Sequence, residues 1–445
     1  MDRPYNGLVK KILRFIRAHL SDQNPLLLLY HKLIAIAAAF RYGFPSRRLR
    51  VIAVTGTKGK STVVHMLTSI LEAAGYKVGV ASTIQFKIGE TVWPNATKQT
   101  TQGRFKLQRL LRLMVREHCD FALVEATSHA LVQSRLWGIN IDTAVLTNIQ
   151  NDHLEYHGSF EEYMHAKGLL FSSFIRMERK RGLKKTAILP LEDPNVSYFQ
   201  SFVADRTIGY GLTEGFVHAE SQQLMAQGSR FRIVVPNDEV EVMMPLPGEF
   251  NIHNALAATA AALVHGVNLS AIKTGLENEL SIPGRLESIQ VGQPFSVIVD
   301  YAHTEESLDK LLAFFKPVTK GKLWLVFGAT GGGRDKSKRP KMGAIGHNYA
   351  DMIVVTDDDP YTEDRMAIIE QVASGIPREE GKGLWKIRDR RAAIKLALTL
   401  AEADDTVVIA GKGCEPIQII GTERIEWDDR AVAREILSSE LEVAL

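Results

Sequence analysis

Hydrophobic and polar positions follow a repeated pattern from Arg50 to the end of the chain. Apolar runs of strand length alternate with longer stretches that carry apolar residues at helical spacing. The first pair is an apolar run at residues 50–54 and a helical stretch that Gly75 ends. Further strands are predicted at residues 77–82, 120–126 and 142–148. This alternation predicts a mostly parallel sheet covered by helices on both faces.

The pattern changes between about Thr186 and Pro245, where several short strands predict a β-rich excursion. A helix at residues 251–266 closes this first unit, and a second α/β unit begins near Pro283. Its strands end in polar or glycine-rich residues, where ligands of such sheets bind. These strands are expected at residues 295–303, 322–329, 350–360 and 405–413. We expect three segments, at residues 1–48, 49–282 and 283–445.

The N-terminal segment 1–48 is expected to be helical. Residues 7–20 place apolar side chains near one helical face and basic side chains mostly on others. An apolar run at residues 25–40 follows, shorter than the roughly 20 residues that cross a bilayer and interrupted by His31 and Lys32. Two interpretations stay open. The segment is either a pair of helices packed on the next domain, or a peripheral surface that touches membrane or a lipid-linked substrate.

Composition narrows the class of protein. A length of 445 residues predicts two or three domains, and 24% charged residues are ordinary for a soluble globular protein. Two cysteines are too few for a disulfide framework or a four-cysteine zinc site and fit a reducing cytoplasm. No secretory signal peptide is visible. Residues 1–50 carry ten basic and two acidic side chains, so the rest of the chain is acidic overall and gives no reason to expect nucleic acid as a partner.

A glycine loop follows the first strand. Gly56, Gly59, Lys60 and Ser61 follow the logic of a phosphate-binding loop, although the spacing is two residues shorter than the common G-x-x-x-x-G-K-[ST]. Backbone N–H groups approach phosphate oxygens, lysine offsets their charge, and the serine hydroxyl can hold Mg²⁺. A strand before the loop and a helix after it give the required context. The sequence therefore predicts a nucleotide triphosphate site.

Two further strand ends offer ligands for a second Mg²⁺, Glu125 and His153. His153 and His157 do not form a fixed helical pair, so a transition-metal site is not favoured. Lys167 lies between apolar residues in a predicted helix, where a lone lysine ordinarily extends to solvent.

Ten ordered motifs carry a resemblance. They read VTGTKGKST, EATSHALVQSR, TNIQNDHLEYHG, HAKGLLF, GEFNIHNALAA, PGRLE, VDYAHT, GGGRDKSKRP, VTDDDPYTED and AGKGCE. From about Arg50 onward the chain resembles the Mur ligase family, most of all its tripeptide synthetases, which add the third peptide residue to UDP-N-acetylmuramoyl-dipeptide. The resemblance implies a phosphate-loop central domain and a Rossmann-like C-terminal domain.

The resemblance also implies roles for individual residues. Catalysis would involve Lys60, Glu125, His153 and Lys167, with Lys167 carbamylated by CO₂ to N6-carboxylysine, and magnesium would be held by Ser61, Glu125 and His153. ATP would be bound by Gly56, Thr57, Lys58, Gly59, Lys60, Ser61, Thr62, Asn254, Arg285, Asp300, Tyr301 and His303. The muramoyl-peptide acceptor would be bound by Thr100, Thr101, Thr127, Gln133 and Arg135. The incoming amino acid would be bound by Arg334, Asp358, Asp359, Tyr361, Gly411 and Glu415.

The implied reaction is ATP-dependent amide formation. ATP converts the acceptor carboxylate into an acyl phosphate, the amine of an amino acid attacks it, and phosphate leaves. Two magnesium ions and lysines would offset the clustered negative charge. Acceptor and amine would lie on different domains, so closure would precede reaction.

Three departures from the family pattern affect the substrates. Only about fifty residues precede the loop, in place of a domain of roughly a hundred that grips UDP, which puts UDP-linked acceptors in doubt. Diaminopimelate-adding members carry Asp-Asn-Pro-Arg, whereas residues 358–361 read Asp-Asp-Pro-Tyr, which favours lysine or ornithine. Lys58 replaces the usual asparagine and adds positive charge near the phosphates. Cys414 replaces a histidine and is expected to be a small buried residue.

Other functions remain to be weighed against this one. A ligase for a different acceptor, such as folylpolyglutamate or a cyanophycin-like polymer, would use the same chemistry. A phosphate-loop NTPase or kinase would not need a second α/β domain with an amino-acid pocket, and a non-catalytic scaffold would not need the filled catalytic positions. The glycines at 331–333 lack the G-x-G-x-x-G spacing of a dinucleotide site, so a dehydrogenase is not expected.

Overall fold

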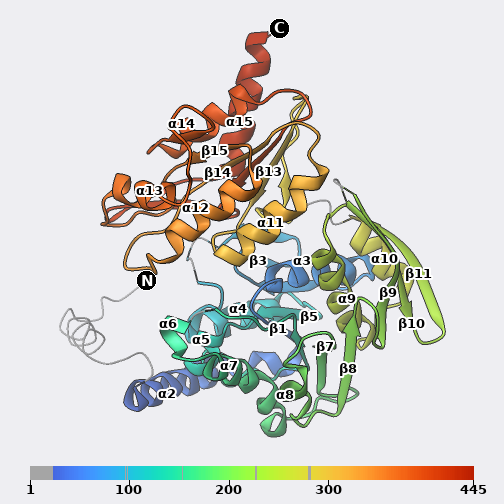
Figure 1. Ribbon diagram of the computed structural model, residues 1–445. Coiled ribbons are helices and arrows are strands. Elements are labelled where there is room, and N and C mark those ends of the chain that lie inside the picture. Colours follow the sequence, from blue (N-terminus) through green and yellow to red (C-terminus); the bar gives the residue numbers. More distant parts are fainter. Residues whose placement is uncertain are drawn as a thin grey trace.

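A computed structural model describes residues 24–95, 97, 99–152, 154–225, 228–278 and 282–444. Two α/β bodies lie one above the other in Figure 1. The lower body, coloured blue to yellow, is built on an 11-stranded sheet, and the upper body, orange to red, on a six-stranded sheet. The predicted α/β fold class, with a helix at the N-terminal side, is confirmed.

The first described helix is α2 (Pro25–Tyr42), followed by a short 3₁₀ turn, η1 (Pro45–Arg48). Asn24 caps its start by accepting a hydrogen bond from the backbone of Leu26, and Gly43 ends it in the left-handed conformation. The helix predicted over residues 25–40 is therefore confirmed and runs two residues further. The helix predicted over residues 7–20 lies outside the described residues.

Six parallel strands form the centre of the large sheet in the order β8-β7-β6-β1-β5-β2. Their bounds are β1 Arg50–Thr55, β2 Val78–Ala81, β5 Phe121–Glu125, β6 Thr143–Leu146, β7 Thr186–Pro190 and β8 Arg206–Gly211. Four of them are buried along their whole length, as expected for a sheet covered on both faces: β2, β5, β6 and β7.

Helices cover both faces of this sheet and bury a separate apolar cluster on each. One face is covered by α3 (Lys60–Ala73), α9 (Glu249–Leu263) and α10 (Leu269–Asn278). The other face is covered by α4 (Arg104–Arg116) and α7 (Phe160–Ser172). Shorter elements in the loops are α5 Ser128–Val132, α6 Leu154–His157, η2 Ser173–Arg176 and α8 Val196–Gln200.

The β-rich excursion is an extension of the same sheet. Its first two strands, β7 and β8, belong to the parallel centre, and β9 joins β8 in parallel before two antiparallel strands complete the edge. These edge strands are β9 Val217–Met225, β10 Gly228–Val235 and β11 Asp238–Met244. Two short antiparallel strands, β3 Gln85–Ile88 and β4 Thr91–Pro94, form the opposite edge.

The upper body has the strand order β12-β13-β17-β14-β15-β16, parallel except for β12. The strands are β12 Glu287–Ser288, β13 Ser296–Asp300, β14 Leu323–Phe327, β15 Met352–Val355, β16 Leu384–Lys386 and β17 Thr406–Ala410. Its helices are α11 Glu305–Val318, α12 Lys338–Tyr349, α13 Arg365–Ala373, α14 Arg390–Leu400 and α15 Asp429–Ala444. A hairpin, β18 Ile417–Ile420 and β19 Glu423–Glu426, lies between β17 and α15.

The two bodies meet beyond the carboxyl ends of their parallel strands. Cys414 follows β17 of the upper body, yet it is buried in the apolar cluster beneath α3 of the lower body. Its predicted burial is thus confirmed. Lys58, after β1, forms an ion pair of 3.2 Å with Glu306 on α11. The predicted boundaries at residues 48/49 and 282/283 stay predictions.

Candidate functional site

Two glycines let the loop between β1 and α3 lie close to neighbouring side chains. Gly56 has a φ of +144° and Gly59 a φ of +81°, conformations that favour glycine. A Cβ on Gly56 would lie 1.9 Å from Oγ1 of Thr147, and one on Gly59 would lie 2.3 Å from Oδ1 of Asn254. The first turn of α3 therefore begins in a tightly bounded loop, with its N–H groups at the carboxyl end of β1.

Two lysine amines converge on one carbonyl of this loop. Nζ of Lys60 donates to the backbone oxygens of Gly56 and Thr57 at 2.8 Å each, and Nζ of Lys167 donates to Gly56 at 2.8 Å. Lys167 lies on α7, is 2% exposed, and has its amine 4.5 Å from the centre of the Tyr163 ring. It does not extend to solvent.

The pKa of Lys167 is well below its usual value because burial removes water from the ammonium and because Lys60 lies nearby. Burial likewise lowers the pKa of Lys60. When protonated, the two lysines would place two positive charges beside one carbonyl, an arrangement that favours anions. A triphosphate, or a negative charge placed on one of the amines, would suit that arrangement.

Oxygen ligands for a cation lie beside the loop. Glu125 ends β5 with no solvent exposure, and its two oxygens accept hydrogen bonds from the backbone and hydroxyl of Thr83 at 2.9 and 2.7 Å. Ser61 is buried in the first turn of α3. His153, the third predicted ligand, lies outside the described residues. A hydroxyl and a carboxylate suit Mg²⁺, which prefers hard oxygen ligands.

The predicted acceptor residues form one hydrogen-bonded group next to Glu125. The hydroxyl of Thr101 donates to the backbone oxygen of Glu125 at 2.8 Å and lies 3.2 Å from the hydroxyl of Thr127. Arg135 donates to the backbone oxygen of Thr101 at 2.7 Å and to Oε1 of Gln133 at 2.7 and 3.1 Å. The hydroxyl of Thr100 lies 3.0 Å from that of Thr83. All five predicted residues are thus brought together.

The segment that enters the upper body faces the phosphate loop. The guanidinium of Arg285 stacks on the Tyr301 ring at 4.5 Å, and its buried Nε has no hydrogen-bond partner among the described residues. Asp300 accepts from the backbone of Leu286 at 2.9 Å and of Ala302 at 2.8 Å, and so fixes this segment. An unpaired buried N–H beside a phosphate loop is suited to a phosphate oxygen.

The upper body gathers acidic side chains at the ends of β15 and β17, where the amino-acid pocket is predicted. Asp358 and Asp359 follow β15 and are each 4% exposed. A Cβ on Gly411 would lie 2.8 Å from Oδ2 of Asp358, so only a glycine lets the backbone come this close. Glu415 accepts a hydrogen bond of 3.2 Å from the Tyr301 hydroxyl, which links this pocket to the Arg285 stack.

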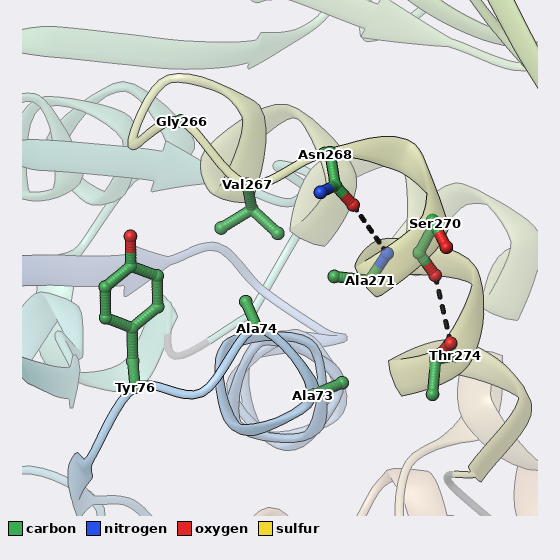
Figure 2. A pocket seen from close by; sticks show the side chains of 9 residues that line it. All are labelled: Ala73, Ala74, Tyr76, Gly266, Val267, Asn268, Ser270, Ala271 and Thr274. Carbon is green, nitrogen blue, oxygen red and sulfur yellow. Dashed lines mark hydrogen bonds between the residues drawn. The ribbon is translucent and has the colours of Figure 1, made fainter.

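A hollow of about 370 Å³ lies elsewhere and carries none of the predicted residues. It lies between the C-terminal end of α3 and the start of α10, roughly 20 Å along α3 from the phosphate loop. Figure 2 shows two of its polar side chains bonded to the backbone of α10: Asn268 accepts from Ala271 at 2.9 Å, and Thr274 donates to Ser270 at 3.0 Å. Without a charged lining residue, it does not suit ATP.

Comparison with known proteins decides the family. Residues 54–262 match the Mur ligase middle domain, and residues 284–413 match the Mur ligase, glutamate ligase domain. The chain is 42% identical over 403 residues to UDP-N-acetylmuramoyl-L-alanyl-D-glutamate–2,6-diaminopimelate ligase of Geobacillus kaustophilus, covering 90% of this chain and 81% of that one. It is 39% identical to UDP-N-acetylmuramyl-tripeptide synthetase of a Roseiflexus species, covering 91% and 82%. The chain belongs to the Mur ligase family.

Solved structures support the same family and fold. A diaminopimelate ligase structure of the same type superimposes with a TM-score of 0.62 at 34% identity, covering 88% of this Mur ligase and 79% of that chain. Folylpolyglutamate synthase of Mycobacterium tuberculosis, complexed with ADP, gives 0.69 at 20% identity over 86% and 93%, which shows a shared fold alone. The protein is an ATP-dependent acid–amino acid ligase of peptidoglycan peptide synthesis.

Two residues of the candidate site, Lys412 and Glu306, were missed from the sequence of this Mur ligase. Lys412 has no exposed side-chain surface and donates to Asp359 and Glu415 at 3.0 Å each. Burial alone would lower its pKa, but Asp358, Glu415 and Asp359 hold that pKa above its usual value. The Gly-Lys-Gly motif was a signal for it, whereas nothing in the sequence singled out Glu306. Arg334, a predicted amino-acid ligand, lies exposed on the glycine-rich loop between β14 and α12.

Proposed function

We propose that this Mur ligase joins the carboxylate of a muramoyl-peptide acceptor to the amine of an amino acid through an acyl phosphate. The acceptor carboxylate oxygen attacks the γ-phosphorus of ATP and ADP leaves. The amine then attacks the acyl carbon, loses a proton and expels phosphate. One observation carries the proposal: a phosphate loop with two converging lysines contacts the other body through Lys58 and Glu306, and that body carries the predicted amino-acid pocket.

Residues of this chain supply the charges that the transfer needs. The amine of Lys60, released from the loop carbonyls, would bind phosphate oxygens together with the unpaired N–H of Arg285. Ser61 and Glu125, with His153 expected beside them, would hold magnesium. Magnesium held there, with two ions expected, would offset the negative charge of the phosphates. A location in the cytoplasm, where ATP is supplied, follows from this requirement.

Lys167 is proposed to carry a carbamate. A neutral amine attacks the carbon of CO₂ and releases one proton, leaving a side chain with a single negative charge. The lowered pKa of Lys167 favours the neutral amine, which is the form that reacts with CO₂. The resulting carboxylate would place a negative charge near Lys60 and would serve as a further ligand for magnesium.

The acceptor is proposed to be a muramoyl dipeptide, as the names of the relatives indicate. Whether it carries UDP is to be tested, because the two family matches begin only at residue 54.

The incoming substrate is proposed to be a diamino acid, with diaminopimelate the first candidate because it is named for the relatives. Lysine or ornithine is the second candidate, favoured by Tyr361. Its ring fills the space beside Gly332, since a Cβ on Gly332 would lie 2.7 Å from Cδ2 of Tyr361. A tyrosine at this position offers no cation to a second carboxylate.

Phosphate release from ATP and Mg²⁺ tests the function. The acceptors are UDP-muramoyl-dipeptide and its UDP-free counterpart, each with lysine, ornithine or meso-diaminopimelate. We expect release that requires both acceptor and amino acid, with formation of a tripeptide. Release that ignores both would show an NTPase and reject the ligase. Preference for lysine, shifted toward diaminopimelate by Tyr361→Arg, would decide for the second candidate.

Lys167→Ala tests the carbamate, with the exposed Lys184→Ala as its matched control. We expect Lys167→Ala to lose nearly all ligation and Lys184→Ala to keep it. Labelled bicarbonate should give a carbamate carbonyl signal in the wild type and in Lys184→Ala alone. Substantial ligation by Lys167→Ala would reject this role.

A further inference from the structure

Helix α2 has a second apolar face that no described residue covers. Its exposed apolar side chains recur at helical spacing and form one stripe along the helix, made of Leu26, Leu29, Tyr30, Leu33, Ala37 and Phe40. Leu26 is 72% exposed and Phe40 is 69% exposed. In a soluble domain a stripe of this kind marks a surface that binds something. We call it the α2 stripe.

The opposite face of α2 is firmly attached to the lower body. Ala35, Ala38 and Ala39 are buried, and the Cβ of Ala39 lies 2.7 Å from where a Cβ on Gly138 would stand. Among the described residues α2 is also the one helix whose length of 18 residues and mean hydropathy of 1.2 would suit a membrane span. Because one face of α2 packs against α4, we favour a helix that lies along a membrane surface over a helix that crosses the membrane. Figure 1 shows α2 at the periphery of the molecule.

An arginine groove adjoins the stripe. A hollow of about 480 Å³ is lined by Phe40, Arg41, Tyr42, Gly43, Arg109, Arg112, Leu113 and Arg116. Three of its arginines are spaced so that they share one face of α4, and the fourth follows the end of the stripe. No acidic residue lines the groove, and no described acidic side chain forms a salt bridge with any of the four arginines.

We propose that the α2 stripe and the arginine groove together bind the surface of an anionic phospholipid bilayer. The stripe would insert into the boundary between headgroups and acyl chains, as amphipathic helices do. The four arginines would pair with lipid phosphates, whose planar recognition suits guanidinium groups. The helix that carries three of the arginines, α4, begins three residues after Thr101, one of the acceptor residues of the proposed function. Docking would therefore hold the acceptor site close to the membrane.

Vesicle flotation of the full chain tests the proposal. The probes are vesicles of phosphatidylglycerol and phosphatidylcholine, vesicles of phosphatidylcholine alone, and inorganic phosphate as competitor. We expect binding to anionic vesicles only, weakened by salt and not displaced by millimolar phosphate. Leu29→Asp with Leu33→Asp should abolish it. Each arginine changed to glutamate should weaken partitioning by at least about fivefold.

Control variants test whether vesicle binding depends on this surface in particular or on any exposed charge or apolar side chain. Leu400→Asp removes a leucine of 46% exposure from the upper body, and Lys320→Glu with Arg424→Glu removes exposed positive charge there. Both should bind vesicles like the wild type. Ligation of a soluble acceptor should be unchanged in every variant, because none of these residues lies in the ligase site, and that readout also reports correct folding.

Three outcomes would overturn the proposal. The wild type could fail to bind anionic vesicles at low salt, or the stripe variants could bind as well as the wild type. The wild type could also sediment as a dimer that Leu29→Asp with Leu33→Asp dissociates, without vesicle binding. That last result would assign the stripe to a second copy of the chain.

Discussion

Arg390 and Asp429 form an ion pair with no solvent exposure in the upper body. Arg390 donates from Nε and Nη2 to the two oxygens of Asp429 at 2.7 Å each. It also donates to the backbone oxygens of Asp357 and Ala410 at 3.0 Å. These two residues immediately precede Asp358 and Gly411 of the amino-acid pocket. Arg390 therefore ties α14 and α15 to the strand ends that form the pocket.

Arg390→Met would leave a buried carboxylate and two buried carbonyls without their donor. Removing one partner of a buried ion pair costs about 3–5 kcal/mol, because the remaining charge stays desolvated. For a body of this size each kcal/mol lowers Tm by about 2–4 °C, so we expect the upper body to melt about 6–20 °C earlier. The KM for the amino acid should rise at temperatures where the variant is still folded.

Calorimetry and urea unfolding would measure the loss, with the neighbouring Arg391→Met as control. Arg391 pairs with Glu435, but the two side chains are 45% and 65% exposed. An exposed pair contributes less than about 1 kcal/mol. The double variant Arg390→Met with Asp429→Leu should recover part of the stability, because no charge is then left buried. Equal losses in Arg390→Met and Arg391→Met would refute the argument that burial of the pair matters.

Three further predictions concern the lower body. Gly56→Ala should weaken ATP binding at least about tenfold by calorimetric titration, since its Cβ would lie 1.9 Å from Oγ1 of Thr147 and its φ is unfavourable for alanine. A double-mutant cycle of Lys58→Met and Glu306→Gln on kcat/KM for ATP should give a coupling of about 0.5–1 kcal/mol, and no coupling would mean that the ion pair does not assist closure. Burial lowers the pKa of His65 to about 4 from 6.5, so its unfolded form takes up a proton that the folded form excludes. The free energy of unfolding should therefore be highest above about pH 6.5 and fall by up to about 1.4 kcal/mol per pH unit between about pH 6.5 and 4. A His65→Leu variant with the same pH dependence would contradict this.

The sequence could predict those parts of the fold that depend on local pattern. The strand at residues 50–54, the glycines after it and the helix ending near Gly75 are contiguous, so spacing alone identified the phosphate loop. The order of motifs was enough to expect the cluster of Thr101, Thr127 and Arg135, whose hydrogen bonds join segments more than twenty residues apart.

Contacts that depend on tertiary placement could not be predicted. Arg390 and Asp429 stand at the starts of two helices with polar sequence, where a charged side chain ordinarily faces water. Glu306 matters only because α11 comes to rest against Lys58. The helical position of Lys167 alone predicted a lysine that reaches solvent, and only the family resemblance gave it a role; it is buried, with its amine on the Gly56 carbonyl. In each case the partner lies far away in the chain.

The position of Arg285 has a consequence for ATP hydrolysis in the absence of the amino acid. This arginine is attached to the upper body by its stack on the Tyr301 ring. Its positive charge helps to lower the pKa of Lys60 on the phosphate loop, so the two groups lie near each other. Any swing that parts the two bodies would withdraw that cation from the triphosphate. An enzyme waiting for its amino acid could then hold ATP at saturating concentration with little futile hydrolysis. Separation of the two bodies would by itself limit ATP hydrolysis, without a separate mechanism that detects the missing amino acid.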